Sequence, residues 1–337
     1  MSRRGVLAGG NWVIDHVKVI DRYPEQDSLA TILEESWSNG GGPYNVLKDL
    51  SRMKAPIPLA GVGLVGDDAY GRYILEDCRK SDIDSSGLCI THEATTSYTD
   101  VMTVKSTGRR TFFHQRGANA LLDASDFGFA TTGARIFYLG YLLLLDRLDV
   151  LYEDNSTGAS RVLYLAKDAG LRTFVDLVSV ESDGFSRLVK PSLPYVDCIA
   201  LNEYEAERLS GITIAKGSQV DVDAVVKAAR SILEMGVNRL VTIHFPAGAL
   251  ALDVDNKCFR QGSVPVPSQQ IKGTVGAGDA FAAGLLYGLH ENWPVPECLK
   301  LAVCVAASSL YDTSTSGSIL PMDECLALGQ ELGFSPL

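Results

Sequence analysis

A chain of 337 residues can bury a large core, and its net charge of −11 at pH 7 argues against sequence-independent nucleic-acid binding, which needs a basic face. The amino terminus lacks the apolar run of a secretory signal, and the longest apolar stretch, 136–145, is too short to span a bilayer. The seven cysteines show no CxxC spacing, so neither a disulfide framework nor a zinc site is expected. These features predict a cytoplasmic protein that binds neither nucleic acid nor membrane.

Short β-rich runs alternate with amphipathic stretches, which is typical of parallel strands connected by helices. Strands are predicted at 57–62, 135–145, 172–177, 198–201 and 239–245. Helices are predicted at 46–53, 70–80, 159–169, 203–209, 222–235, 278–290, 296–311 and 322–332. Two extended segments, about 13–36 and 95–116, do not fit the alternation and predict a small β lid inserted in a single α/β domain spanning 1–337.

The segment Gly61–Gly66 follows a predicted strand and fits the G-x-G-x-x-G dinucleotide pattern, with Asp82 and Asp84 about 20 residues further on. This pattern would indicate an NAD-dependent oxidoreductase. However, Asp67 and Asp68 directly after the third glycine would bring like charge close to a pyrophosphate. A tight strand-to-helix turn is therefore the preferred interpretation, and the oxidoreductase remains an alternative.

The segment 273–281 is the most informative part of the chain, because it opens a small-residue helix and places Asp279 beside its first amides. Glycine and alanine leave those N–H groups unobstructed, and the helix dipole adds roughly half a positive charge there. A transferring phosphoryl group would be stabilised at this point, and Asp279 could take a proton from an attacking hydroxyl. The same residues also fit an ordinary helix start with an acidic first turn.

Other polar positions allow two interpretations each. Three glycines at 40–42 precede Asn45, whose amide suits hydroxyl recognition, although a plain loop before a helix would look the same. Asn202 and Glu205 fit a helix cap, the preferred local interpretation, and Glu205 could also organise water around Mg²⁺. Arg116 could bind a carboxylate or phosphate, or be a surface charge.

Taken in chain order, these pieces resemble the ribokinase-like carbohydrate kinases, also called the phosphofructokinase B family. The resemblance covers about residues 6–310. It rests on Asp15, the segment from Gly40-Gly41 to Asn45, the segment Gly61 to Gly71 with its Gly66-Asp67 turn, Gly117-Ala118-Asn119, Asn202-x-x-Glu205, and Gly276-Ala277-Gly278-Asp279. It implies a ribokinase-like fold, in which a doubly wound, mostly parallel α/β sheet is flanked by helices and carries a β lid.

The resemblance also implies an ATP-dependent kinase that transfers the γ-phosphoryl group to a hydroxymethyl group of a small sugar, sugar acid or nucleoside. Asp279 would be the general base, and the amides of Gly276, Ala277 and Gly278 would form the anion hole. The implied substrate contacts are Asp15, Gly41, Gly42, Asn45, Arg116 and Asn119. The implied nucleotide contacts are Asn202, Thr242, Gly248, Thr274, Gly276 and Gly278, with the helix around 304–308 closing the adenine pocket. Glu205 would hold Mg²⁺, through water.

Two departures from the family pattern bear on function. Gly273 removes a carboxylate that helps bind a monovalent cation in ribokinase-like relatives, which puts activation by potassium in doubt. The same departure motivates a second hypothesis, a catalytically weak sugar-binding or regulatory homologue. Val13 stands where many relatives have an asparagine, so one polar sugar contact is missing. Relatives often dimerise through the lid, whose exposed strand edges need cover, so a homodimer is expected.

Overall fold

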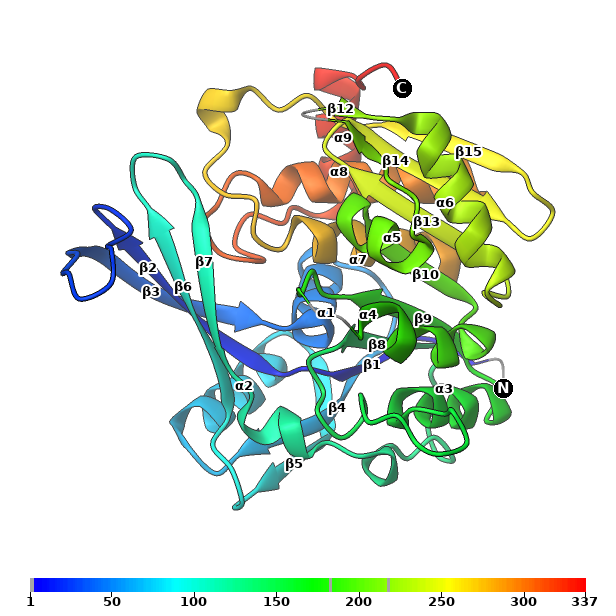
Figure 1. Ribbon diagram of the computed structural model, residues 1–337, viewed down its shortest axis with the longest axis horizontal. Coiled ribbons are helices and arrows are strands. Elements are labelled where there is room, and N and C mark those ends of the chain that lie inside the picture. Colours follow the sequence, from blue (N-terminus) through cyan, green and yellow to red (C-terminus); the bar gives the residue numbers. More distant parts are fainter. Residues whose placement is uncertain (1–2, 182–183, 217–218) are drawn as a thin grey trace.

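Figure 1 shows the computed structural model, in which helices cover a central sheet and a smaller sheet projects from it. The structure describes residues 3–181, 184–216 and 219–337. In spatial order, the strands of the central sheet are β15 (Cys258–Gly262), β14 (Gly248–Asp253), β13 (Leu240–Phe245), β10 (Cys198–Asn202), β9 (Arg172–Leu177), β8 (Ile136–Leu142), β1 (Val6–Gly10), β4 (Leu59–Gly66) and β5 (Ile83–Thr91). The strands from β13 to β5 pair in parallel, and β14 and β15 are added by antiparallel pairing.

The chain enters the sheet at β1 and then winds to both sides of it. β4 and β5 follow on one side, whereas β8, β9, β10 and β13 follow in order on the other. The predicted doubly wound, mostly parallel α/β fold is therefore confirmed. The carboxyl ends of β1 and β8 form the switch point at which sheets of this kind bind their ligands. Asn11 and Tyr141, which lie at these two strand ends, are candidates for a site.

Each face of the central sheet packs against its own layer of helices. One layer contains α1 (Gly42–Arg52), α2 (Ala69–Lys80), α7 (Ala277–His290), α8 (Val295–Ser309) and α9 (Met322–Leu332). The other contains α3 (Gly158–Asp168), α4 (Phe185–Val189), α5 (Glu203–Ser210) and α6 (Val222–Glu234). Short elements are η1 (Gly117–Leu121), η2 (Ala124–Asp126), η3 (Lys190–Tyr195), η4 (Ser268–Gln270), β11 (Ala215–Lys216) and β12 (Gln219–Val220). Within the described residues, no helix is long and apolar enough to cross a membrane.

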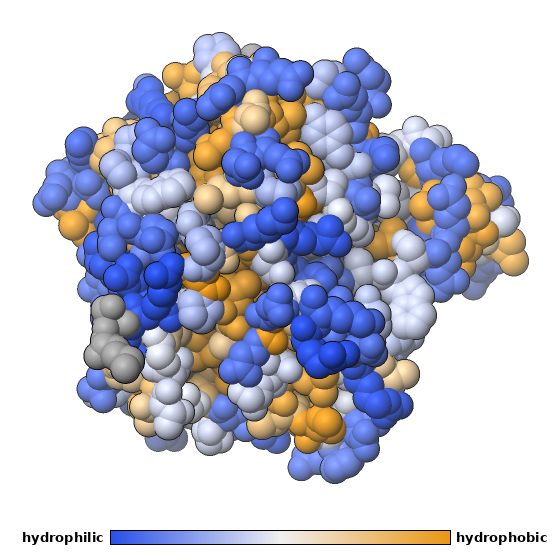
Figure 2. All heavy atoms as spheres, turned by 180° about the vertical axis from the view of Figure 1, so that it is seen from behind, coloured by the Kyte–Doolittle hydropathy of each residue, from blue (hydrophilic) through white to orange (hydrophobic). Residues whose placement is uncertain are grey.

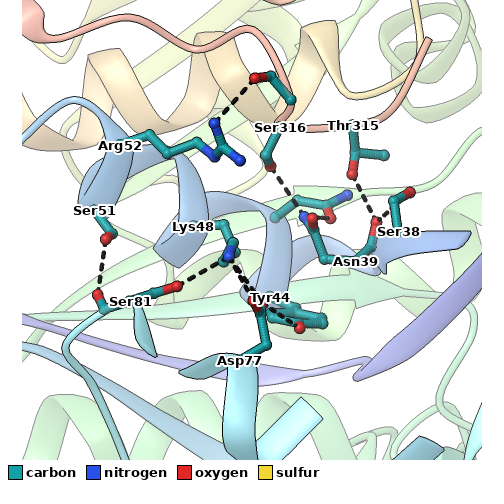
Figure 3. Close-up of polar contacts among 12 residues, drawn as sticks. Ser38, Asn39, Tyr44, Lys48, Ser51, Arg52, Asp77, Ser81, Thr315 and Ser316 are labelled. Atoms are coloured by element: carbon teal, nitrogen blue, oxygen red, sulfur yellow. Dashed lines mark hydrogen bonds and ion pairs between the residues drawn. The ribbon is translucent and has the colours of Figure 1, made fainter. Parts of the chain in front are cut away.

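Polar contacts as well as apolar burial hold α1 in place. The buried Lys48 pairs with Asp77 of α2 at 2.8 Å and donates a hydrogen bond to the Ser81 hydroxyl at 2.9 Å (Figure 3). The Tyr44 hydroxyl donates to the same Asp77 carboxylate at 2.6 Å. These bonds anchor α1 against α2. Asn45, which follows Tyr44 in α1, therefore lies at the ligand-binding edge of the central sheet.

The lid is a four-stranded sheet that projects from the core (Figure 1). Its strands, in spatial order, are β3 (Ile32–Gly40), β2 (Val13–Ile20), β6 (Ser97–Val104) and β7 (Arg110–Gln115). Side chains alternate between its faces: Asp15 and Thr99 point toward the core cavity, whereas His16 stacks on Tyr98 on the other face, with ring centroids 5.3 Å apart. Seen from behind, the lid projects at the right edge with apolar side chains exposed beside hydrophilic ones (Figure 2).

The predicted strands omit β1, β5, β14 and β15, and two further details of the predicted fold were wrong. Gly61–Gly66 lie inside β4 and do not form a strand-to-helix turn. Their glycines are explained by Trp12, which packs on the strand so closely that a Cβ on Gly61 or Gly63 would lie 2.5 Å from its ring. The expected lid segment 13–36 also ends too early, because strand β3 continues to Gly40.

Candidate active site

Two cavities meet at the start of α7, beside the carboxyl ends of the central strands. The larger, of about 770 Å³, lies between the lid and the switch point, and Asp15 and Tyr141 are in its wall. The second, of about 630 Å³, lies between the β13–β14 turn and α8 and is largely apolar. The residues that line both are Asn202, His244, Thr274 and Gly278. A ligand in one cavity can therefore contact a ligand in the other.

The turn that begins α7 has the shape expected of an anion cradle. Gly276 is left-handed, with φ of 74°, and a Cβ there would lie 2.5 Å from the Thr315 carbonyl oxygen, so glycine is required. A Cβ on Gly278 would meet nothing closer than an imidazole ring at 3.5 Å, so its surface is open. The Ala277 amide already donates to the Thr274 carbonyl at 3.4 Å. Gly278, in the same first turn, lines both cavities, and the free amides at a helix N-terminus attract anions.

Asp279 lies in the first turn of α7, where it is only 6% exposed. The Tyr141 hydroxyl donates to both of its oxygens, at 2.7 Å to Oδ1 and 2.8 Å to Oδ2, and Asn45 Nδ2 donates to Oδ2 at 2.9 Å. Burial raises the pKa of Asp279 to about 6, against the lowering effect of these hydrogen bonds. The carboxyl group is therefore ionised at neutral pH and able to accept a proton.

The orientation of the Asn45 amide is determined by a buried hydrogen-bond chain. Asn39 Nδ2 donates to Asn45 Oδ1 at 2.8 Å and to Ser316 Oγ at 3.0 Å; Figure 3 shows Asn39 and Ser316 facing one another. Because Asn45 Oδ1 accepts from Asn39, its amide nitrogen is turned toward Asp279. Gly41, just before α1, has φ of 84°, and a Cβ there would lie 2.2 Å from a carbonyl oxygen.

Asp15 adds a second carboxyl group to the larger cavity. Burial, and then the negative charge of Asp279, raise the pKa of Asp15 to about 7, and the Thr99 hydroxyl opposes this rise. Among the predicted substrate contacts, Asp15, Gly41 and Asn45 line this cavity together. Gly42 lies beside it, where a Cβ would meet the Tyr138 hydroxyl at 2.7 Å and the Tyr141 ring at 3.0 Å.

Asn202 and Glu205 form both a helix cap and part of the cavity wall. Asn202 Oδ1 accepts from the Glu205 amide at 2.9 Å, and Glu205 Oε2 accepts from the Asn202 amide at 3.0 Å, which makes the predicted capping box. Ser179 donates to Glu205 Oε1 at 2.9 Å. Burial raises the pKa of Glu205 to about 7. The pKa of Asp176 is also raised, first by burial and then by the negative charge of Glu205. Two neighbouring carboxyl groups of this kind can contribute oxygen ligands to a divalent cation.

The second cavity combines apolar walls with one imidazole. Gly248 and the α8 residue Ala307 line it, as the predicted adenine pocket requires. His244 lies between the cavities with its ring 4.9 Å from that of Phe281, and burial lowers its pKa to about 4, so it is neutral at pH 7. Thr242, a predicted nucleotide contact, is fully buried deeper in β13 and lines neither cavity.

Three predicted substrate contacts do not line the larger cavity: Gly42, Arg116 and Asn119. Arg116 forms an ion pair with Asp146 at 2.5 Å. Asn119 is fully buried, where it accepts from the Trp12 amide and donates to the Trp12 carbonyl, both at 3.2 Å. Sequence reasoning missed three residues that do line this cavity, Tyr141, Asp176 and Arg110. Only the first two had a signal, because each lies near the carboxyl end of a parallel strand.

A family model described as pfkB family carbohydrate kinase matches residues 9–322. The chain belongs to this family. This carbohydrate kinase is 29% identical over 333 residues to fructokinase-1 of Zea mays, with 94% of each chain covered. It is 22% identical to 5-dehydro-2-deoxygluconokinase of Shouchella clausii, with 87% of this chain and 86% of the relative covered.

Solved structures share the fold of this kinase. Ribokinase from Thermotoga maritima has a TM-score of 0.77 at 21% identity and covers 96% of this chain and 99% of its own. Arabidopsis thaliana ribokinase complexed with ribose and ATP has a TM-score of 0.76 at 22% identity, and the match covers 99% of this chain and 100% of that ribokinase. The family and the enzyme class predicted from the sequence are confirmed, and the oxidoreductase alternative loses its basis because Gly61–Gly66 form a strand. The roles of single residues stay predictions.

Proposed function

We propose that this kinase transfers the γ-phosphoryl group of ATP, with Mg²⁺, to a hydroxymethyl group of a small sugar, sugar acid or nucleoside. The observation that carries the proposal is the meeting of two unlike cavities at the cradle before Asp279. The larger, polar cavity suits an acceptor with several hydroxyl groups. The second, apolar cavity suits a nucleotide base, and the Arabidopsis thaliana ribokinase of the same fold is described in complex with ribose and ATP.

The hydrogen bonds of Asp279 indicate which oxygen acts as the base. Oδ2 accepts from both Tyr141 and Asn45, whereas Oδ1 accepts from Tyr141 alone. A carboxylate oxygen has two lone pairs, so Oδ1 keeps one for the acceptor hydroxyl. The proton passes to Oδ1, the hydroxyl oxygen forms the new bond to phosphorus, and the bond to ADP breaks. The open amides beside Gly278 stabilise the charge on the phosphoryl oxygens.

Asp176 and Glu205 are the residues that would hold Mg²⁺, in part through water. Both are buried carboxyl groups with raised pKa values, and each is raised in part by neighbouring negative charge. Oxygen donors are what a hard divalent cation prefers. When bound, Mg²⁺ neutralises charge on the phosphate oxygens of the donor. Ser179, which donates to Glu205, holds that carboxylate in one orientation.

We also propose that two copies pair through their lids. The outer strands β3 and β7 have free edges, and they expose Ile32, Trp37, Phe112 and Phe113, each at least half exposed. Exposed strand edges with apolar side chains favour pairing with another chain.

The test is ADP formation from Mg-ATP across a panel of sugars, sugar acids and nucleosides, with Asp279→Asn as the control. Acceptor-dependent ADP release that falls by at least a hundredfold in the variant supports the proposal. Equal turnover by both proteins would remove Asp279 as the base. Thermal stabilisation by a sugar without any ADP release would favour the sugar-binding alternative.

A further inference from the structure

A further cavity, which we call the amino-end cavity, lies at the opposite edge of the central sheet from the two cavities of the active site. Its volume is about 180 Å³, and it shares no lining residue with either of them. The first residues of three neighbouring strands line it: Ile136 of β8, Arg172 of β9 and Cys198 of β10. Leu289, near the carboxyl end of α7, closes it. The amino-end cavity and the anion cradle are therefore separated by the length of α7, about 20 Å for 14 residues.

The charges in the wall of the amino-end cavity are all positive. Among the described residues that line it, Arg172 and Arg239 are the only ones that are charged at neutral pH, in a protein with a net charge of −11. Cys198 is neutral, because burial raises the pKa of its thiol to about 12. The rest of the wall is apolar apart from Thr173 and Asn292. A cavity with two guanidinium groups and no carboxylate in its wall attracts a negatively charged ligand.

The order of the strands brings the two arginines to one place. β10 pairs with β9 on one side and with β13 on the other, so that Cys198 lies opposite both Phe174 and Leu240. Arg172 lies two residues before Phe174, and Arg239 directly precedes Leu240. The two arginine side chains therefore reach the amino-end cavity from the two strands that flank β10.

Arg172 uses only part of its hydrogen-bonding capacity. Its Nη1 donates to the Leu289 carbonyl at 3.4 Å, which helps to cap α7, and to Asn292 Oδ1 at 2.9 Å. A guanidinium has five N–H donors, and Nη2 and Nε of Arg172 make no hydrogen bond within the described residues. Arg172 is therefore held in place by α7 and still has donors for a ligand.

Arg239 makes no hydrogen bond or ion pair within the described residues. Burial, and then the positive charges of Arg239 and Arg135, lower the pKa of Arg172 and outweigh the opposing carboxylate of Asp197. That carboxylate is itself paired with Lys167 at 2.9 Å. Guanidinium groups that repel one another without a carboxylate between them cost free energy, and a bound anion would offset this cost.

We propose that the amino-end cavity binds a small oxyanion, which Arg172 and Arg239 hold from two sides while its organic part packs on Trp293. At about 30 Å³ for each water molecule, the volume corresponds to roughly six waters and suits a phosphate or carboxylate with a short organic group. Both groups present the same chemistry, because each accepts two parallel hydrogen bonds from a guanidinium. The site goes beyond the proposed kinase reaction, since none of its residues lines the active-site cavities.

The test is calorimetry of the full chain with inorganic phosphate and with citrate, and it compares Arg239→Gln with Arg260→Gln. Arg260 is an exposed arginine of β15 that lines neither this cavity nor those of the active site, so its replacement removes the same charge elsewhere. We expect saturable binding at millimolar concentration in Arg260→Gln and at least tenfold weaker binding in Arg239→Gln. Weaker binding of phosphate alone assigns a phosphate ligand, and weaker binding of citrate alone assigns a carboxylate. Anions at the α7 cradle would bind both variants equally, so equal binding, or no saturable binding of either anion, overturns the proposal.

Tryptophan fluorescence tests where the anion binds. Trp293 lines the amino-end cavity, so a bound anion should change its emission. The change should disappear in Trp293→Phe and persist in Trp37→Phe, which removes an exposed tryptophan of the lid. A change that persists in Trp293→Phe, or no change in the unsubstituted protein, overturns the proposal. Arg239→Gln should also keep its melting temperature in buffer without multivalent anions, because a lower value there would mean that Arg239 already has a partner in the protein, which overturns the proposal as well.

Discussion

Replacing Tyr141 with phenylalanine removes one hydroxyl group from the base and leaves the shape of the cavity nearly unchanged. That hydroxyl donates to both oxygens of Asp279, at 2.7 and 2.8 Å. A hydrogen bond to a charged group contributes about 1.5–3 kcal/mol. One pKa unit corresponds to about 1.4 kcal/mol. We therefore expect the pKa of Asp279, which is about 6, to rise by roughly one to two units in Tyr141→Phe.

The assay is the pH dependence of kcat/KM for ADP formation, from about pH 5 to pH 9.5. The base acts in its ionised form, so kcat/KM increases as pH rises through its pKa. Tyr141→Phe should move this increase up by roughly one to two pH units, so activity near pH 6 falls about five- to fiftyfold and recovers near pH 9. Four other carboxyl groups interact electrostatically with Asp279: Asp15, Asp49, Asp176 and Glu205. The pH profile of kcat/KM therefore reports the titration of this coupled set of carboxyl groups.

Tyr138→Phe is the matched control. Its hydroxyl, also on strand β8, donates to Asp176 at 3.3 Å and makes no hydrogen bond to Asp279 in the part of the chain that the structure describes. The substitution removes the same atom, and we expect it to shift the profile far less. The reasoning is refuted if both variants shift the profile equally, or if Tyr141→Phe lowers activity by the same factor at every pH.

Three further substitutions test the start of α7. Asp279→Asn should lower kcat by a factor of about 10²–10⁴. It should also raise the melting temperature at pH 8, because a carboxyl group whose folded pKa is raised to about 6 stabilises the fold only at low pH. A lower melting temperature at pH 8 would contradict this. Gly278→Ala should keep its melting temperature and lose turnover, since its methyl group would enter the open cavity. Gly276→Ala should instead lose about 1–2 kcal/mol of stability or more, because φ is 74° there. Equal melting temperatures for the two alanine variants would count against this reading of the turn.

Local periodicity predicted the α/β alternation and the five central strands β4, β8, β9, β10 and β13, but not β1, β5, β14 and β15. Helix α9 and strand β9 have the predicted bounds, and α7 begins at Ala277, one residue before its predicted start. The G-x-G-x-x-G pattern misled because its cause is distant in sequence. The Trp12 ring, whose Nε1 donates to the Val62 carbonyl at 3.0 Å, occupies the space that side chains at Gly61 and Gly63 would need.

The partners of the base could not be predicted, because they depend on which strands are neighbours. Asp279 is 138 residues from Tyr141 and 234 from Asn45, and the packing of helices α1 and α7 beside strand β8 brings them together. The strand register of the lid could not be predicted from the sequence either. β2 pairs in parallel with β6, so Asp15 lies opposite Thr99, and no local signal sets that register. The sequence therefore predicts a phosphate cradle at the start of α7 but could not predict which lid residues lie opposite one another.

The carboxyl groups of the site oppose folding at neutral pH, which bears on why they are there. Burial raises the pKa of Asp279 from 3.8 to about 6, and those of Asp15 and Glu205 to about 7. Such a group contributes stability below its unfolded pKa and loses it as pH rises through the folded value. For Asp279 the rise of about two units corresponds to roughly 3 kcal/mol. A cluster that weakens the fold is best explained by a bound state in which cations and hydroxyl groups offset the repulsion between these carboxyl groups.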